Sequence, residues 1–177
     1  MRTQLRHYNL AIFVLVLTIF SVTDVFCQEK SKKQLKEEQK LEKQKQIALL
    51  VESKEFVFTV ERVIPQGGRT FMPTTEYNME FHPELINSYL PYAGRAFNVG
   101  YGGDEGMIFE GQPSVYTVEK TKKAYQIKAE VKGKNDTFSI LLTVYFEGNA
   151  YLSINSNNRC SISYDGEIEA FKSKDKK

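Results

Sequence analysis

The sequence predicts a mainly β protein, an antiparallel sheet that closes as a barrel or packs as a two-sheet sandwich, preceded by an N-terminal helical segment. The main observation is that apolar and polar residues alternate in four consecutive runs between positions 124 and 164. Successive side chains of a strand point to opposite faces, so this period of two indicates half-buried antiparallel strands. Polar segments with Gly and Asn separate the runs, which suits hairpin loops. A helix, with about 3.6 residues per turn, would scatter the same residues around its circumference.

The four runs differ in how apolar their two faces are. The second run is partly apolar on both faces, so we expect it to be the most buried strand. The alternating residues are Tyr125, Ile127, Ala129 and Val131 in the first run, Phe138, Ile140, Leu142, Val144 and Phe146 in the second, Tyr151, Ser153 and Asn155 against Leu152 and Ile154 in the third, and Cys160, Ile162 and Tyr164 in the fourth.

Shorter strands are predicted before these runs, at 55–64, 77–81 and 115–119, from the same alternation. The first is expected to end at Pro65, because proline cannot donate to a sheet ladder. Eight or so strands of this length form either a closed barrel or two packed sheets, and the alternation does not choose between them.

The N-terminus has the pattern of an export signal. Basic residues precede an apolar run at 10–20, which is shorter than the ~20 apolar residues of a membrane-spanning helix. We therefore predict a signal peptide at 1–27, cleaved near Cys27, and a mature form in the periplasm or cell envelope that does not span the membrane. Lipidation of Cys27 or a retained membrane anchor is the alternative. Lipidation fits less well, because Val25 and Phe26 are larger than the residues that usually precede a lipidated cysteine.

A charged segment follows, predicted as a helical spacer at 28–50. Lys, Glu and Gln dominate it and Gly and Pro are absent, which favours helix. A coiled-coil partner helix would need apolar residues at heptad spacing, and these are missing. The apolar patch from Ile47 to Val51 is expected to dock on the sheet. The antiparallel domain is placed at 51–171 and a charged tail at 172–177.

Composition excludes some functions. The net charge is +2, so bulk charge does not favour nucleic acid as a partner.

Cys160 is expected to be a small buried residue in a strand, and His82 an exposed or capping imidazole at a strand end. We predict no catalytic residues and no cofactor, because the sequence has no signature for either. We also predict no metal site, because His82 has no neighbouring His or Cys.

Residues 85–111 are the least regular part of the chain, and we call them the aromatic-glycine loop. Four glycines fall between positions 100 and 106, and loops of this length in compact domains are often functional. The candidate ligand-binding residues are Tyr92, Arg95, Phe97, Tyr101 and Asp104. The alternative is a structural loop in which the arginine is held by a carboxylate and the aromatic rings cover one end of the sheet.

Other chemistries for this loop fit less well. A phosphate-binding loop leads into a helix, whereas these glycines lead into 107–109, which has the pattern of a strand. Calcium loops carry alternating acidic ligands, and Asp104 and Glu105 are adjacent instead. The same adjacency argues against a hydrolase, since acid–base catalysis needs two separated carboxyl groups.

Two blocks of sequence resemble a known family. The first is NSYLPYAGRAF at 87–97 with YGGDEGMIF at 101–109, and the second is GNAYLSINSNNR at 148–159 with ISYDG at 162–166. They are similar to exported proteins of Bacteroidetes known as domain of unknown function 4251. The resemblance covers about 51–171 and implies a Gram-negative cell-envelope setting. It implies no activity, substrate or catalytic residue.

These observations favour a non-catalytic binding module of the cell envelope, with a small molecule or an envelope protein as its unknown partner. The binding-module hypothesis predicts a concave apolar site bordered by Tyr92, Arg95 and Tyr101. The alternative is a structural or protein-interaction module of the periplasm. A hydrolase is the third hypothesis.

Overall fold

The computed structural model describes residues 32–97, 106–133 and 136–172. The predicted signal peptide therefore lies outside the described residues. The chain divides into two units, Met1–Glu38 and Gln39–Lys177. The described residues form one helix and nine strands, which are α2 (Lys32–Ser53), β1 (Phe56–Pro65), β2 (Asn78–Phe81), β3 (Ile86–Pro91), β4 (Gly106–Gly111), β5 (Pro113–Lys120), β6 (Ala124–Lys132), β7 (Thr137–Tyr145), β8 (Asn149–Ser156) and β9 (Ile162–Glu169).

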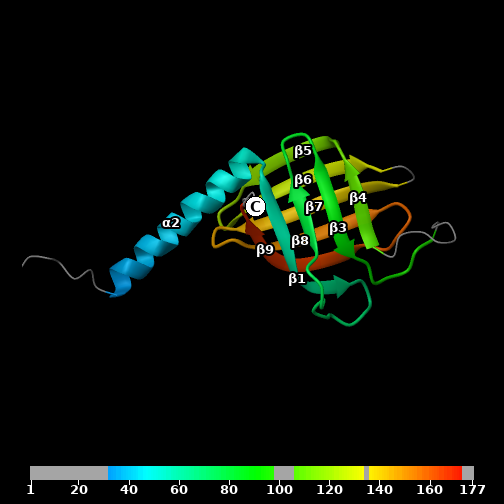
Figure 1. Ribbon diagram of the computed structural model, residues 1–177, viewed down its shortest axis with the longest axis horizontal. Coiled ribbons are helices and arrows are strands. Elements are labelled where there is room, and N and C mark those ends of the chain that lie inside the picture. Colours follow the sequence, from blue (N-terminus) through cyan, green and yellow to red (C-terminus); the bar gives the residue numbers. More distant parts are fainter. Residues whose placement is uncertain (1–31, 98–105, 134–135, 173–177) are drawn as a thin grey trace, which may run out of the picture. The chain divides into compact units, whose positions relative to one another are not determined.

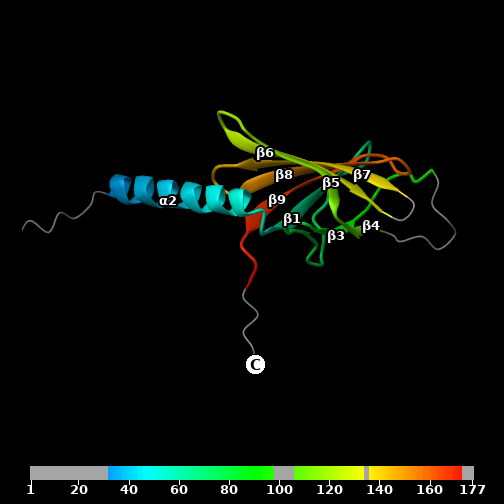
Figure 2. The same ribbon diagram turned by 90° about the horizontal axis from the view of Figure 1, so that it is seen from above.

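All of these strands belong to one antiparallel sheet, in the order β4-β3-β2-β1-β9-β8-β7-β6-β5. Consecutive strands pair as hairpins within β1–β4 and within β5–β9, and the pairing of β1 with β9 joins the two meanders. The first meander crosses over the second, as both views show (Figures 1 and 2). The sheet thus curls into a nearly closed barrel, with β4 and β5 as its edges. The predicted mainly β, antiparallel class is confirmed, and the structure favours the barrel.

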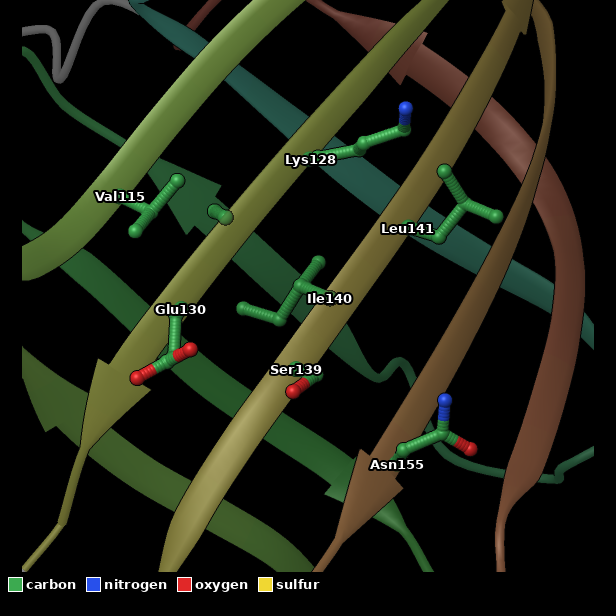
Figure 3. A pocket seen from close by; sticks show the side chains of 8 residues that line it. Val115, Lys128, Glu130, Ser139, Ile140, Leu141 and Asn155 are labelled. Carbon is green, nitrogen blue, oxygen red and sulfur yellow. The ribbon is translucent and has the colours of Figure 1, made fainter.

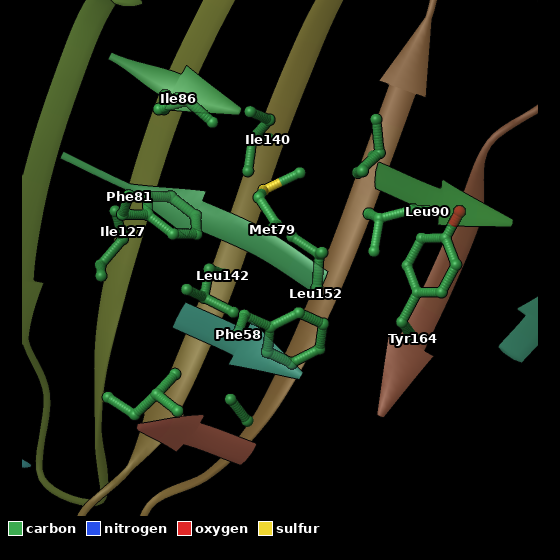
Figure 4. Packing of buried hydrophobic residues seen from close by; sticks show 14 of the residues in the cluster. Phe58, Met79, Phe81, Ile86, Leu90, Ile127, Ile140, Leu142, Leu152 and Tyr164 are labelled. Carbon is green, nitrogen blue, oxygen red and sulfur yellow. The ribbon is translucent and has the colours of Figure 1, made fainter. Parts of the chain in front are cut away.

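The core lies between the two meanders. Phe58, Met79, Phe81, Ile86 and Leu90 of β1–β3 face residues of β6–β9 across it (Figure 4). The residues that meet them are Ile127, Ile140, Leu142, Leu152 and Tyr164. On β6–β9 these are the residues that the alternation assigns to one face, so the period of two predicted the buried side correctly.

Strand β3 lies within residues 85–111, which were predicted to be irregular, and this prediction was wrong. Its inward residues are Ile86, Ser88 and Leu90, and the middle one is polar. Ser88 is completely buried, and its hydroxyl donates to the carbonyl oxygen of Met107 at 2.7 Å. A buried polar group is tolerated when it is hydrogen-bonded. The serine interrupts the apolar pattern in the sequence and hides the strand.

The last strand begins later and extends further than predicted. Cys160 was expected to be buried in a strand, but it is half-buried and precedes β9. The reason is that its N–H donates to the Arg95 carbonyl oxygen at 3.0 Å, outside the β8–β9 ladder. Further along β9, Gly166 lies against β1, and a Cβ there would overlap the Thr59 carbonyl oxygen. Only glycine allows β1 and β9 to approach this closely.

The last turns of α2 pack on the sheet, as the apolar patch predicted. Ile47 and Val51 are buried members of the core. Gly148, in the β7–β8 turn, has a φ of 97° and lies in van der Waals reach of Ile47, so a side chain there would be strained. Across the described residues, no helix combines the length and apolar character needed to cross a membrane.

Candidate functional site

Residues 95–97 of the aromatic-glycine loop are fixed against the segment between β8 and β9. The Phe97 N–H donates to the Asn158 carbonyl oxygen at 2.8 Å, and the Arg95 carbonyl oxygen accepts from Cys160. Ala96 and Arg159 form an isolated antiparallel bridge between these bonds. Residues 95–97 and 158–160 therefore form a short ladder of backbone hydrogen bonds, at the end of the barrel where β8 finishes.

Two tyrosines and an arginine complete this contact. The Tyr92 hydroxyl donates to the Arg95 carbonyl oxygen at 2.7 Å, and the Arg159 guanidinium lies 5.3 Å from the centre of the Tyr92 ring. The same guanidinium donates to the Gly106 carbonyl oxygen. The Tyr164 hydroxyl donates to the Pro91 carbonyl oxygen at 2.7 Å. We call Tyr92, Arg159, Cys160 and Tyr164 the rim cluster.

Burial governs the ionisation of both phenols. It raises the pKa of Tyr164 well above its ordinary value, and the neighbouring Tyr92 raises it further. Burial is also the largest cause of the raised pKa of Tyr92. Both groups therefore stay neutral donors at physiological pH, which suits holding backbone carbonyl groups in place.

The predicted ligand residues are divided by this arrangement. Tyr92 is half-buried in the rim cluster, while Arg95 and Phe97 are exposed. Among the described residues Arg95 has no carboxylate within ion-pair distance, and its contact is made by its backbone. The carboxylate partner suggested for it in a structural loop is therefore absent from the described part of the chain. Tyr101 and Asp104 lie outside the described residues, so the predicted site stays a prediction.

A hollow of about 300 Å³ lies elsewhere, on the outer face of β5–β8. Its lining residues are Val115, Lys128, Ala129, Glu130, Ser139, Ile140, Leu141 and Asn155. The strand register explains its shape. Lys128 lies opposite Leu141, and one row further along the sheet Ser139 lies opposite both Glu130 and Asn155 (Figure 3). Between these rows the side chains of Ala129 and Ile140 turn inward, which leaves backbone as the floor. We call this the outer hollow.

The charged groups of the outer hollow lie close to other polar groups. The Lys128 ammonium lies 3.6 Å from a Glu119 carboxylate oxygen. The Ser114 hydroxyl donates to the Glu130 carbonyl oxygen at 3.2 Å, and a Glu130 carboxylate oxygen lies 3.5 Å from the same hydroxyl. Ser139 and Asn155 are exposed, and no described residue hydrogen-bonds their side chains. The hollow thus presents an amide and a hydroxyl beside aliphatic surface.

The aliphatic surface comes from two side chains that the sheet does not bury. Val115 is 47% exposed and Leu141 is 38% exposed. Small-ligand sites combine apolar walls with a few placed polar groups and begin at about 300 Å³. The outer hollow is at the lower end of that range.

Sequence reasoning missed the outer hollow. The second run contained a signal, because Leu141 is an apolar residue on the more polar face of that strand. Its presence was interpreted as a sign that both faces are buried, whereas the structure leaves Leu141 exposed. Among the described residues no three His, Cys, Asp or Glu side chains gather as a metal site requires.

Comparisons with known proteins agree with the fold. Residues 38–168 match the model of a family described as Domain of unknown function (DUF4251). A crystal structure of a DUF4251 family protein from Bacteroides eggerthii is similar to this chain, with a TM-score of 0.57 and 20% sequence identity. The similarity covers 72% of this chain and 87% of that one. No curated protein shows significant sequence similarity to the chain.

Proposed function

From the premise that the chain belongs to the DUF4251 family, we propose that it is a non-catalytic binding module whose ligand occupies the outer hollow. The observation that carries the proposal is the juxtaposition of Ser139 and Asn155, whose side chains have no hydrogen-bond partner among the described residues, with exposed Val115 and Leu141. Groups of this kind recognise a neutral ligand that has hydrogen-bonding groups and an apolar group.

The ligand class follows from what the charged residues do. The opposite charges of Lys128 and Glu130 cancel among the residues that line the hollow, so the hollow has no net charge to attract an ion. The hollow is also open to solvent on the outer face of the sheet. A short neutral peptide segment or a compound of similar size suits such a surface better than a buried cofactor does.

The test is a binding screen by NMR on the isotope-labelled protein, with neutral dipeptides and monosaccharides as probes. We expect shift changes at the amides of Val115, Ser139 and Asn155. Ser139→Leu should fill the hollow and abolish them. Thr143→Leu is the matched control, because Thr143 lies on the same face of β7 outside the hollow.

Three outcomes would overturn this function. The first is the absence of binding by any probe, and the second is equal binding by both variants. The third is shift changes confined to Tyr92, Arg95 and their neighbours, which would support the site predicted in the aromatic-glycine loop instead. Turnover of hydrolase substrates that is lost in Asp104→Asn would revive the enzyme hypothesis.

We also propose that the protein acts in the periplasm or cell envelope. The support is the signal-peptide pattern at 1–27 and the family resemblance of the sequence. Mass spectrometry of the protein from a fractionated Gram-negative host tests this, and a mature chain beginning at Gln28 in the periplasmic fraction is expected. A full-length cytoplasmic chain would contradict it, and an added lipid mass on Cys27 would replace cleavage by lipidation.

The structural or protein-interaction module is the second candidate. It is favoured by one observation, the unpaired edge of β5 among the described strands.

A further inference from the structure

Strand β5 forms one edge of the sheet, and most of its residues are exposed. It spans Pro113–Lys120, and six of its eight residues are exposed. No described segment pairs with its second edge. The other edge strand, β4, is shorter, and its end at Gly111 lies against Val131 of β6. The two edges are therefore not equivalent.

Exposed edges usually carry features that prevent pairing, such as charges, proline or bulges. In β5 these features lie at the ends. Pro113 and an irregular register mark its start, and Glu119 and Lys120 mark its finish. The middle, Val115 to Val118, has β-branched or aromatic residues and no charge. Val118 faces inward by register with Ile127, yet it is 40% exposed. A neighbouring strand would cover it.

We propose that β5 pairs antiparallel with β5 of a second copy of the chain, with Thr117 on the twofold axis. This proposal goes beyond the ligand-binding function and does not depend on it. In such a pair, opposite residues lie on the same face, so a twofold axis must pass through a residue position. With Thr117 on the axis, Val115 lies opposite Glu119, Tyr116 opposite Val118 and Ser114 opposite Lys120.

This register is the most favourable of those that the strand allows. It pairs an aromatic residue with a β-branched one twice, places two threonines together and sets no like charges opposite each other, all of which stabilise strand pairs. An axis through Tyr116 would bring Pro113 into the ladder, where it cannot donate. An axis through Val118 would shorten the overlap, because the strand ends at Lys120.

The pairing would also add a residue of the second copy to the outer hollow. Val115 forms one of its walls and lies at the open edge of the sheet. In the proposed dimer, Glu119 of the second copy lies opposite that wall. A single strand pair is at the small end of protein interfaces, below about 1,200 Å², so we expect a dimer that dissociates on dilution.

Disulfide trapping tests the pairing and the register. In the full chain with Cys27→Ser and Cys160→Ser, Thr117→Cys should form a disulfide-linked dimer under mild oxidation, since directly opposite Cβ atoms are about 5 Å apart. Glu119→Cys is the matched control and should form no disulfide-linked dimer, because the two Glu119 positions lie several residues apart along the ladder. The double variant Val115→Cys, Glu119→Cys should cross-link again.

Sedimentation of the unmodified chain, from low micromolar to near millimolar concentrations, should show a reversible monomer–dimer equilibrium. Thr117→Lys places two like charges opposite each other and should weaken association about tenfold or more. Thr143→Lys, on the same outer face but away from the edge, should not. A monomer at every concentration, equal trapping of Thr117→Cys and Glu119→Cys, or a dimer unaffected by Thr117→Lys would each overturn the proposal.

Discussion

The two ends of the barrel are closed by different kinds of contact. At the end where β7 turns into β8, Ile47 and Val51 of α2 enter the core as apolar side chains. At the opposite end, where β8 leaves the sheet, the Tyr92 and Tyr164 hydroxyls hold backbone carbonyl groups. Burial of apolar surface is non-directional and tolerates variation in shape, whereas hydrogen bonds require defined geometry. The first end is thus built for stability, and the second positions a particular loop.

The largest expected effect is at the helix end. Val51 is 1% exposed, so Val51→Asp would bury a charge without a partner and should lower the free energy of unfolding by about 3–5 kcal/mol. Leu49→Asp is the control, because Leu49 is 65% exposed on the same helix and should change stability by at most about 0.5 kcal/mol. Urea unfolding followed by circular dichroism measures both. Equal effects would show that α2 does not close this end.

A smaller effect is expected at the loop end. Tyr164→Phe removes the donor to the half-buried Pro91 carbonyl oxygen, and the loss of one such hydrogen bond should lower the free energy of unfolding by about 1 kcal/mol. Tyr151→Phe is the matched control, since Tyr151 is 37% exposed on the outer face. The same unfolding assay applies. If Tyr164→Phe left the free energy of unfolding unchanged, packing alone would close this end of the barrel.

The two phenols Tyr164 and Tyr116 predict how stability depends on alkaline pH. Burial raises the pKa of Tyr116 to about 12 and that of Tyr164 further above the ordinary value of 10.0. A raised folded-state pKa gives stability that is complete below the unfolded pKa and is lost as the pH rises above it. We expect each group to contribute a loss of about 1.4 kcal/mol per pH unit from pH 10 up to its folded-state pKa, which for Tyr116 is about 12.

Urea unfolding at a series of pH values between neutral and strongly alkaline measures this slope. Tyr164→Phe should remove the contribution of Tyr164 from the slope of the free energy of unfolding against pH. Tyr151→Phe should leave this slope unchanged. A slope that Tyr164→Phe does not alter would contradict the burial argument.

The smallest effect is expected from the ion pair between α2 and the β7–β8 turn. The Lys40 ammonium lies 2.8 Å from a Glu147 carboxylate oxygen, and the hydrogen bond to Lys40 lowers the pKa of Glu147. A lowered carboxyl pKa gives stability that is present at neutral pH and lost as the pH falls through the folded-state value. Both side chains are exposed, so solvent screens the pair, and Glu147→Gln should change neutral stability very little. A large loss would mean that polar contacts also close the helix end.

The difference between the ends also explains what could be predicted. Periodicity reports which residues are apolar and how they are spaced, so it identified the buried face of β6–β9 and the docking patch before β1. It does not report hydrogen bonds between distant backbone segments. The bond from Cys160 to Arg95 left no pattern in the sequence, and buried Ser88 gave a misleading one. The outer hollow depends on which exposed side chains lie opposite one another, and register was not predicted.

The pairing of β1 with β9 has a consequence for how the chain becomes a folded protein. The first strand can complete its hydrogen bonds only with a strand made near the end of synthesis. Contacts between such distant segments form slowly, because the intervening chain must be ordered first. A chain that emerges from a ribosome or a translocation pore N-terminus first would therefore hold β1 unsatisfied until its last residues arrive. Deleting β9 should then leave the hairpins of β1–β4 prone to aggregation rather than produce a smaller stable domain.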